Sequence, residues 1–191
     1  MRSSGSTRSP PPDGPVRLFV RLAGEDHPKA CTGRRLLARG LVRSPSGSSA
    51  RPIVLDPHAD RPLSAVDLPT AAREGILAVD CSWNRLADRG RLPAFLEGAE
   101  RTGPHRRLPI LLAANPQHFG RPTELNTVEA LAAATYLVDR PDQAARLLEG
   151  FRGGPAFWTL NRERLAAYRA ARNADEVRSA ERRLFGGPTE P

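Results

Sequence analysis

The chain has 191 residues and a formal net charge of +8, and Lys29 is its only lysine. No apolar run approaches the ~20 residues of a membrane span, and residues 1–15 lack the apolar core of a signal peptide. The two cysteines, Cys31 and Cys81, are too few for a disulfide framework, so we expect a reducing cytoplasm. The basic charge favours a polyanionic partner such as RNA, although an arginine-rich proteome would produce the same excess.

The first half of the chain alternates short apolar runs with helical patterns. Strands are expected at residues 16–22, 53–55 and 76–79, with helices at 33–40 and 67–74. After a helical or irregular connection at 85–98 and a polar loop at 100–107, the run PILLA at 109–113 predicts a second buried strand. This alternation of strands and helices indicates a mainly parallel α/β sheet.

From Asn126 onward the pattern is helical. Residues 126–129 resemble a capping box, Pro141 begins a second helix that stops at the glycine pair 153–154, and a third begins near Asn161. Residues beyond about Ala174 are charged. We divide the chain into a disordered tail (1–15), an α/β region (16–114), a helical region (115–173) and a charged tail (174–191).

The stretch that follows the central strand carries unusual side chains. Asp80 and Trp83 come directly after the apolar run 76–79. Because open α/β sheets bind ligands outside the carboxyl ends of their strands, this pair suits the floor of a site for a flat, charged ligand. An aspartate with satisfied hydrogen bonds and a core tryptophan would give the same sequence.

Common catalytic motifs are missing from the sequence. It contains no GxGxxG, no GxxxxGK[ST] and no GxSxG. Its four histidines are scattered, and His27 with Cys31 would supply only half of a zinc site. These absences argue against a dinucleotide enzyme, a P-loop enzyme, a serine hydrolase and a metal centre.

Four segments together resemble a known family. They are DHPKACTG at 26–33, VDCSW at 79–83, LPILLAANP at 108–116 and VEALAAA at 128–134. In this order they are similar to the small-subunit (16S/18S) rRNA aminocarboxypropyltransferases of archaea and eukaryotes, over roughly residues 16–168. The resemblance implies a SPOUT-like fold: a mainly parallel, knotted α/β region that binds the cofactor, and a helical C-terminal part that completes the site.

The resemblance also implies an activity. The family transfers the 3-amino-3-carboxypropyl group of S-adenosylmethionine to N3 of a modified pseudouridine and releases methylthioadenosine. We therefore expect S-adenosylmethionine as donor, no metal, and small-subunit rRNA or a pre-ribosomal particle as partner. The protein would be a cytoplasmic monomer without membrane contact. Two alternatives stay open: the same transfer to a tRNA uridine, as in DTW-domain proteins, and a non-catalytic rRNA-binding assembly factor.

Matching positions give the site that the resemblance implies. Asp80 corresponds to the acid near the reactive side chain, where it would act either as general base or as a positioning group. Leu55, Pro57 and Trp83 would form the apolar wall. Thr32 and Thr127 fit helix caps equally well, and Leu108 fits plain core. The full cofactor set is Thr32, Leu55, Pro57, Val79, Trp83, Leu108, Thr123 and Thr127.

Overall fold

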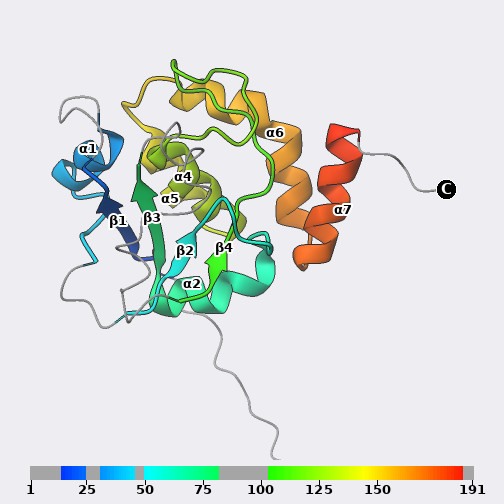
Figure 1. Ribbon diagram of the computed structural model, residues 1–191, viewed down its shortest axis with the longest axis horizontal. Coiled ribbons are helices and arrows are strands. Elements are labelled where there is room, and N and C mark those ends of the chain that lie inside the picture. Colours follow the sequence, from blue (N-terminus) through cyan, green and yellow to red (C-terminus); the bar gives the residue numbers. More distant parts are fainter. Residues whose placement is uncertain (1–13, 25–30, 46–49, 82–102, 187–191) are drawn as a thin grey trace, which may run out of the picture.

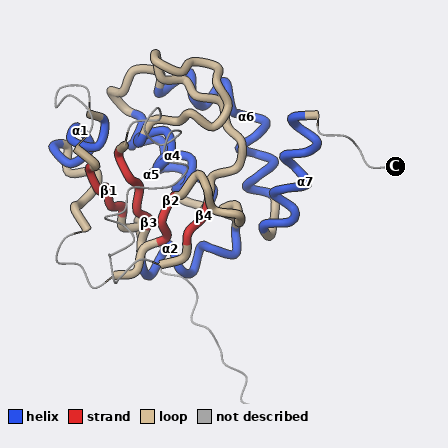
Figure 2. Tube along the Cα trace, in the orientation of Figure 1, coloured by secondary structure: helices blue, strands red, loops and turns tan. Residues whose placement is uncertain are grey.

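The computed structural model describes residues 14–24, 31–45, 50–81 and 103–186. Trp83, the predicted connection at 85–98 and most of the predicted N-terminal tail lie outside these described residues. In the described part, four strands form one parallel sheet in the order β1-β3-β2-β4 (Figures 1 and 2). The strands are β1 (Leu18–Leu22), β2 (Ile53–Leu55), β3 (Ile76–Asp80) and β4 (His105–Arg106).

The strands predicted at 16–22, 53–55 and 76–79 are confirmed as β1, β2 and β3. Strand β4 falls inside the segment predicted to be a polar loop, so that prediction is wrong there. Because β4 is a two-residue edge strand that pairs with β2 alone, its sequence carries no apolar alternation to reveal it.

Helices pack on the sheet and then on one another. Helix α1 contacts β1, α2 contacts β2, and α4 contacts β3; α5 and α6 pack on α4, and α7 packs on α6 at the side of the molecule away from the sheet (Figure 1). The helices are α1 (Thr32–Ala38), the 3-10 turn η1 (Ala65–Asp67), α2 (Leu68–Glu74), α4 (Thr127–Leu137), α5 (Pro141–Leu148), α6 (Gly154–Ala170) and α7 (Ala174–Phe185).

The two faces of the sheet bury different side chains. Leu18, Val20 and Ala78 belong to the main core with α4, whereas Phe19 and Leu77 belong to a smaller cluster. Successive side chains of a strand point to opposite faces. The side chain of Asp80, two residues after Ala78, therefore lies on the helix-covered face.

Helix α6 begins at Gly154, well before the predicted start near Asn161, so the glycine pair opens a helix. Gly153 has a φ of 83°, and a Cβ there would lie 2.3 Å from the carbonyl oxygen of Ala114. Only glycine allows this approach with this backbone conformation. The pair therefore serves close packing against the segment that contains Ala114, while Pro155 occupies the first turn of α6.

Much of the predicted charged tail is helix α7. Val177 and Ala180 are buried, and Asn173 caps the helix by accepting hydrogen bonds from the N–H groups of Asp175 and Glu176. The parallel α/β arrangement with a helical C-terminal part is confirmed; the knot stays a prediction. None of the helices in the described residues is long and apolar enough to cross a membrane.

Candidate functional site

Asp80 ends β3 at the carboxyl edge of the sheet, and it is only 7% exposed. Its Oδ2 accepts hydrogen bonds from the Cys31 thiol at 2.7 Å and from the Gly33 N–H at 3.1 Å. Its Oδ1 accepts a hydrogen bond from the Thr127 hydroxyl. One carboxylate thus joins β3 to the first residues of both α1 and α4.

The start of α1 is built around the Cys31 thiol. Cys31 is the N-cap residue, and its Sγ accepts a hydrogen bond from the Arg34 N–H at 3.4 Å while donating to Asp80. Burial raises the pKa of Cys31 to about 11, and the hydrogen bond to Asp80 adds to this rise. The thiol therefore stays protonated at neutral pH and remains a donor. Thr32, a predicted cofactor residue, is the half-buried first residue of this helix.

Gly33 allows α1 to approach the sheet closely. A Cβ at this position would lie 2.7 Å from Leu22 Cδ2, 2.8 Å from Val20 Cγ1 and 2.8 Å from Asp80 Oδ2. Such contacts are shorter than side chains tolerate without displacement. The absence of a side chain at Gly33 therefore lets its N–H reach the Asp80 carboxylate.

The start of α4 confirms the predicted capping box. Asn126 Oδ1 accepts a hydrogen bond from the Glu129 N–H at 2.9 Å, and Glu129 Oε2 accepts one from the Asn126 N–H at 2.9 Å. Thr127 follows as the first residue of the helix, buried and bonded to Asp80. The first N–H groups of a helix lack partners within it and carry partial positive charge, which favours an anionic group at this end of α4.

The apolar residues of the predicted cofactor set lie on both faces of the sheet. Leu55, at the end of β2, belongs to the main core, whereas Val79 packs on the smaller cluster on the opposite face. Pro57 is exposed just beyond β2, and Leu108 is partly buried against the main core. If Val79 touches a ligand on the Asp80 face, the contact comes from its backbone. Trp83 lies outside the described residues.

Thr123 is exposed and has a backbone φ of 67°. A β-branched residue in the left-handed region is a true conformational outlier, and such residues gather at functional sites. Its N–H donates to the Leu111 carbonyl at 2.8 Å, and its carbonyl accepts from the Leu125 N–H at 2.8 Å. The loop thus holds the strained residue in place between the LPILLAANP segment and α4.

Residues 109–113 do not form the second buried strand that the sequence predicts. The segment is extended, but buried side chains of the C-terminal helices supply partners for its backbone. Glu129 Oε1, for example, accepts a hydrogen bond from the Ala114 N–H at 2.9 Å. An apolar run has the same pattern whether its amides bond to a strand or to side chains.

Histidine and acidic side chains do not form a metal site in the described part of the chain, because no group of three potential ligands is placed to hold an ion. His105 Nδ1 pairs with Asp56 Oδ2 at 2.7 Å, and His118 pairs with Glu124. These are ordinary polar pairs at the ends of β2 and in the loop before α4.

Three residues that build this site lie outside the predicted cofactor set: Cys31, Gly33 and Glu129. Cys31 and Gly33 flank Thr32 at the start of a predicted helix, where a capping side chain and a close approach are common needs. Glu129 was expected only as a capping-box partner, and its bond to Ala114 joins residues far apart in the chain.

Comparisons with known proteins cover nearly the whole chain. A family model described as "Ribosome biogenesis protein, C-terminal" matches residues 53–185. The 16S rRNA aminocarboxypropyltransferase of Methanopyrus kandleri is 42% identical, over 84% of this chain and 93% of that protein. The 18S rRNA aminocarboxypropyltransferase of Schizosaccharomyces pombe is 35% identical, over 90% of this chain and 58% of that protein.

A solved structure resembles the fold as well. The SAM-dependent rRNA:acp-transferase Tsr3 from Vulcanisaeta distributa superimposes with a TM-score of 0.73 and 29% sequence identity. The match covers 90% of this chain and 99% of that chain. The similarity therefore includes the parallel sheet and the C-terminal helices together.

Proposed function

The chain belongs to the small-subunit rRNA aminocarboxypropyltransferase family, and we propose that it transfers the 3-amino-3-carboxypropyl group of S-adenosylmethionine to small-subunit rRNA. The acceptor we propose is N3 of a modified pseudouridine, with methylthioadenosine as the second product. The observation that carries this proposal is the Asp80 carboxylate, to which the first residues of α1 and α4 bond at the carboxyl edge of the sheet.

The transfer is a displacement at carbon. The pseudouridine N3 forms a bond to the γ-carbon of the methionine chain as the bond from that carbon to sulfur breaks. The electron pair of that bond goes to sulfur, which becomes the neutral thioether of methylthioadenosine, and the N3 proton leaves to a base or to water. Because the sulfonium has three activated carbons, orientation of the donor decides which group moves.

The proposed donor site lies along the carboxyl ends of β2, β3 and β4. The N-terminal end of α4, at Thr127, suits the carboxylate of the methionine chain. Leu55 and Leu108 offer apolar surface where neighbouring parallel strands end. We keep Thr32, Pro57, Val79, Trp83 and Thr123 in the proposed lining on the family resemblance.

We propose that Asp80 positions the donor rather than accepting the N3 proton. Both of its oxygens already accept hydrogen bonds, and it is buried between two helices. A negative charge fixed there favours the positive sulfonium or amino group of the donor. A carboxylate is also a weak base for an imide proton.

Small-subunit rRNA is the partner that fits this activity. The net charge of +8, supplied mainly by arginine, suits the phosphate backbone. We place the activity in the cytoplasm, because neither Cys31 nor Cys81 forms a disulfide, as expected in a reducing compartment. That the protein works as a monomer stays a prediction.

Nucleoside mass spectrometry of cells with and without the gene tests the function. We expect an aminocarboxypropylated nucleoside in small-subunit rRNA that disappears on deletion and returns when the gene is restored. Loss of such a nucleoside from tRNA instead would assign the protein to a tRNA uridine. Unchanged RNA in both fractions would contradict the proposal and favour a non-catalytic assembly factor.

A further inference from the structure

Side chains of the C-terminal helices hold one edge of the segment from Arg107 to Asn115, while its other edge bonds to the backbone of residues 120–123. The N–H groups of Ile110, Leu112 and Ala114 donate to Glu181, Asn161 and Glu129 at 2.9, 2.8 and 2.9 Å. These acceptors come from α7, α6 and α4 in turn. Alternate residues of an extended chain face the same side. Three helices, α4, α6 and α7, therefore each supply one acceptor to the same edge of the segment.

The part of the segment around Leu108 depends most on α7. Arg107 is still attached to the loop after β2 by backbone hydrogen bonds, its carbonyl accepting from the Leu63 N–H at 2.8 Å. Within the described part of the chain, residues 108–110 make no backbone–backbone hydrogen bond, and such bonds resume at Leu111. The position of Leu108 is therefore set by side-chain contacts on either side of it.

Glu181 of α7 supplies those contacts on both sides of Leu108. Its oxygens accept two hydrogen bonds from Arg107, from Nη1 at 2.6 Å and from Nη2 at 2.7 Å, and its Oε1 also accepts one from the Ile110 N–H at 2.9 Å. Arg107 Nη1 in turn donates to the Leu108 carbonyl at 3.2 Å, and the Tyr168 hydroxyl donates to the Ile110 carbonyl at 3.0 Å.

Burial and charge keep the Arg107 guanidinium and the Tyr168 hydroxyl protonated. Glu181 is only 6% exposed, and its hydrogen bonds raise the pKa of Arg107. Burial raises the pKa of Tyr168, and the charge of Glu181 adds to the rise. Both partners therefore remain donors at physiological pH. Removing one partner of a buried charged pair leaves the other charge unpaired, which is strongly unfavourable.

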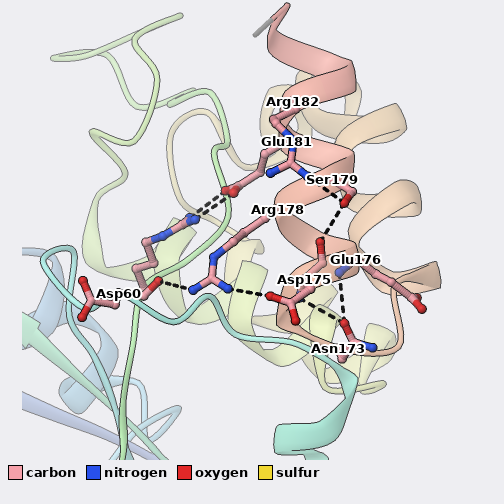
Figure 3. A network of polar contacts seen from close by, with 9 residues as sticks. Asp60, Asn173, Asp175, Glu176, Arg178, Ser179, Glu181 and Arg182 are labelled. Carbon is pink, nitrogen blue, oxygen red and sulfur yellow. Dashed lines mark hydrogen bonds and ion pairs between the residues drawn. The ribbon is translucent and has the colours of Figure 1, made fainter. Parts of the chain in front are cut away.

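Helix α7 also contacts the loop that follows β2. Arg178 donates to the Asp60 carbonyl at 3.0 Å and pairs with Asp175 at 2.7 Å (Figure 3). The loops that leave the carboxyl ends of β2 and β4 thus rest on one helix. Those two strand ends border the proposed donor site.

We infer that Glu181 is a positioning residue for the donor site, which acts through Arg107 to fix the backbone of Leu108. This inference rests on the proposed function, because it assumes that Leu108 borders bound S-adenosylmethionine. The C-terminal helix α7 then serves the reaction without touching the donor. Its contribution is to hold residues 108–110, which make no backbone–backbone hydrogen bond with the described part of the chain.

The test measures two quantities for each variant of the full chain: the Kd for S-adenosylmethionine and the melting temperature. The Kd is measured by calorimetry below the melting temperature. Glu181→Ala should raise the Kd by roughly 10–100-fold, since small displacements of positioning groups have large effects. Glu181→Gln keeps one carbonyl acceptor and should raise the Kd less. Val177→Ala is the matched control, because Val177 is fully buried on the same helix. It should lower the melting temperature and leave the Kd within about twofold, since it removes packing and no hydrogen bond of the segment.

Hydrogen exchange supplies a second readout. The Ile110 amide should exchange faster in Glu181→Ala than in Val177→Ala at equal distance below the melting temperature. The positioning role alone would be overturned if the Glu181 variants bound S-adenosylmethionine with the wild-type Kd. It would also be overturned if Val177→Ala raised the Kd as much as Glu181→Ala does. A wild-type protein that does not bind S-adenosylmethionine would overturn the proposed function and this inference with it. If Glu181→Ala does not fold, Glu181→Gln carries the same comparison.

Discussion

At the scale of single residues, the site depends on the Asp80 carboxylate, which accepts hydrogen bonds from donors at the starts of both α1 and α4. Asp80 and Thr127 were predicted site residues from the family resemblance, but their hydrogen bond was not, since it joins residues 47 positions apart. Cys31 and Gly33 stand in the matching segment without a predicted role. A sequence identifies which residues carry polar groups; it does not state which donor meets which acceptor across the fold. The pairings at Asp80 therefore required the structure.

Asp80→Asn tests the positioning role of this carboxylate. The amide keeps the size of the side chain but removes its charge. Its NH2 group replaces one of the two carboxylate oxygens and then faces either the donors of Cys31 and Gly33 or the hydroxyl of Thr127. We expect S-adenosylmethionine affinity and transfer rate to fall together, with stability lowered by about 1–3 kcal/mol.

The control is Thr135→Ala, which removes a fully buried hydroxyl that donates to the Leu131 carbonyl in the second half of α4. It should lower stability and leave donor affinity near the wild-type value. A rate that drops by roughly 10²–10⁴-fold at unchanged affinity in Asp80→Asn would instead identify Asp80 as a general base.

Cys31 gives the protein a specific alkaline dependence. Its pKa is about 11 in the folded chain, against an ordinary value of 9.0. Below pH 9 both states hold the proton, and the stabilisation is fully present. Between pH 9 and 11 the unfolded chain ionises first, so stability falls by an amount on the order of 2 kcal/mol.

Urea unfolding from pH 8 to 11 measures this loss. Serine does not ionise in this range and can still donate to Asp80, so Cys31→Ser should show a smaller decline than the wild type. Identical pH profiles for the two proteins would contradict the assignment, because Tyr168 and the other ionisable groups are common to both.

At the scale of elements, the apolar strands and the capped helix were predictable and the extended connections were not. Runs such as 76–79 reveal buried strands, and the polar cap at Asn126 reveals the start of α4. The run at 109–113 has the same composition as a strand, yet side chains of later helices bond its backbone. Helix α7 was missed because its inward positions include the buried Glu181, which counts as polar in any hydropathy pattern.

Glu129→Ala tests how strongly α4 holds the segment before it. Glu129 accepts hydrogen bonds from the N–H groups of Asn126 and Ala114 and from the Asn115 side chain at 2.8 Å, all of which would lose a partner. We expect the free energy of unfolding, measured in urea, to fall by about 2–3 kcal/mol, because the helix loses a cap and buried donors are left without acceptors.

Glu163→Ala on the exposed face of α6 is the comparison, and we expect it to change stability by less than about 0.5 kcal/mol. Glu129→Gln keeps one carbonyl acceptor, so its loss of stability should lie between those of Glu129→Ala and Glu163→Ala. Equal stability of Glu129→Ala and Glu163→Ala would contradict the bridging role of Glu129.

At the scale of the whole molecule, a parallel sheet and a set of C-terminal helices meet at a single carboxylate. The mainly parallel α/β class followed from alternating patterns along the chain, and the family followed from four separated segments. The way α4, α6 and α7 reach back to residues 107–115 could not be predicted, because it depends on contacts between distant parts of the chain. The helical half thus supports the loops that the sheet half presents to the donor.

The identity of the small-molecule product tests the central claim most directly. The purified protein is incubated with S-adenosylmethionine and small-subunit RNA that lacks the modification, and the nucleosides released from cofactor and RNA are identified by mass spectrometry. The account predicts methylthioadenosine in equal amount to an aminocarboxypropylated nucleoside. S-adenosylhomocysteine together with a methylated nucleoside would contradict it and make the protein a methyltransferase.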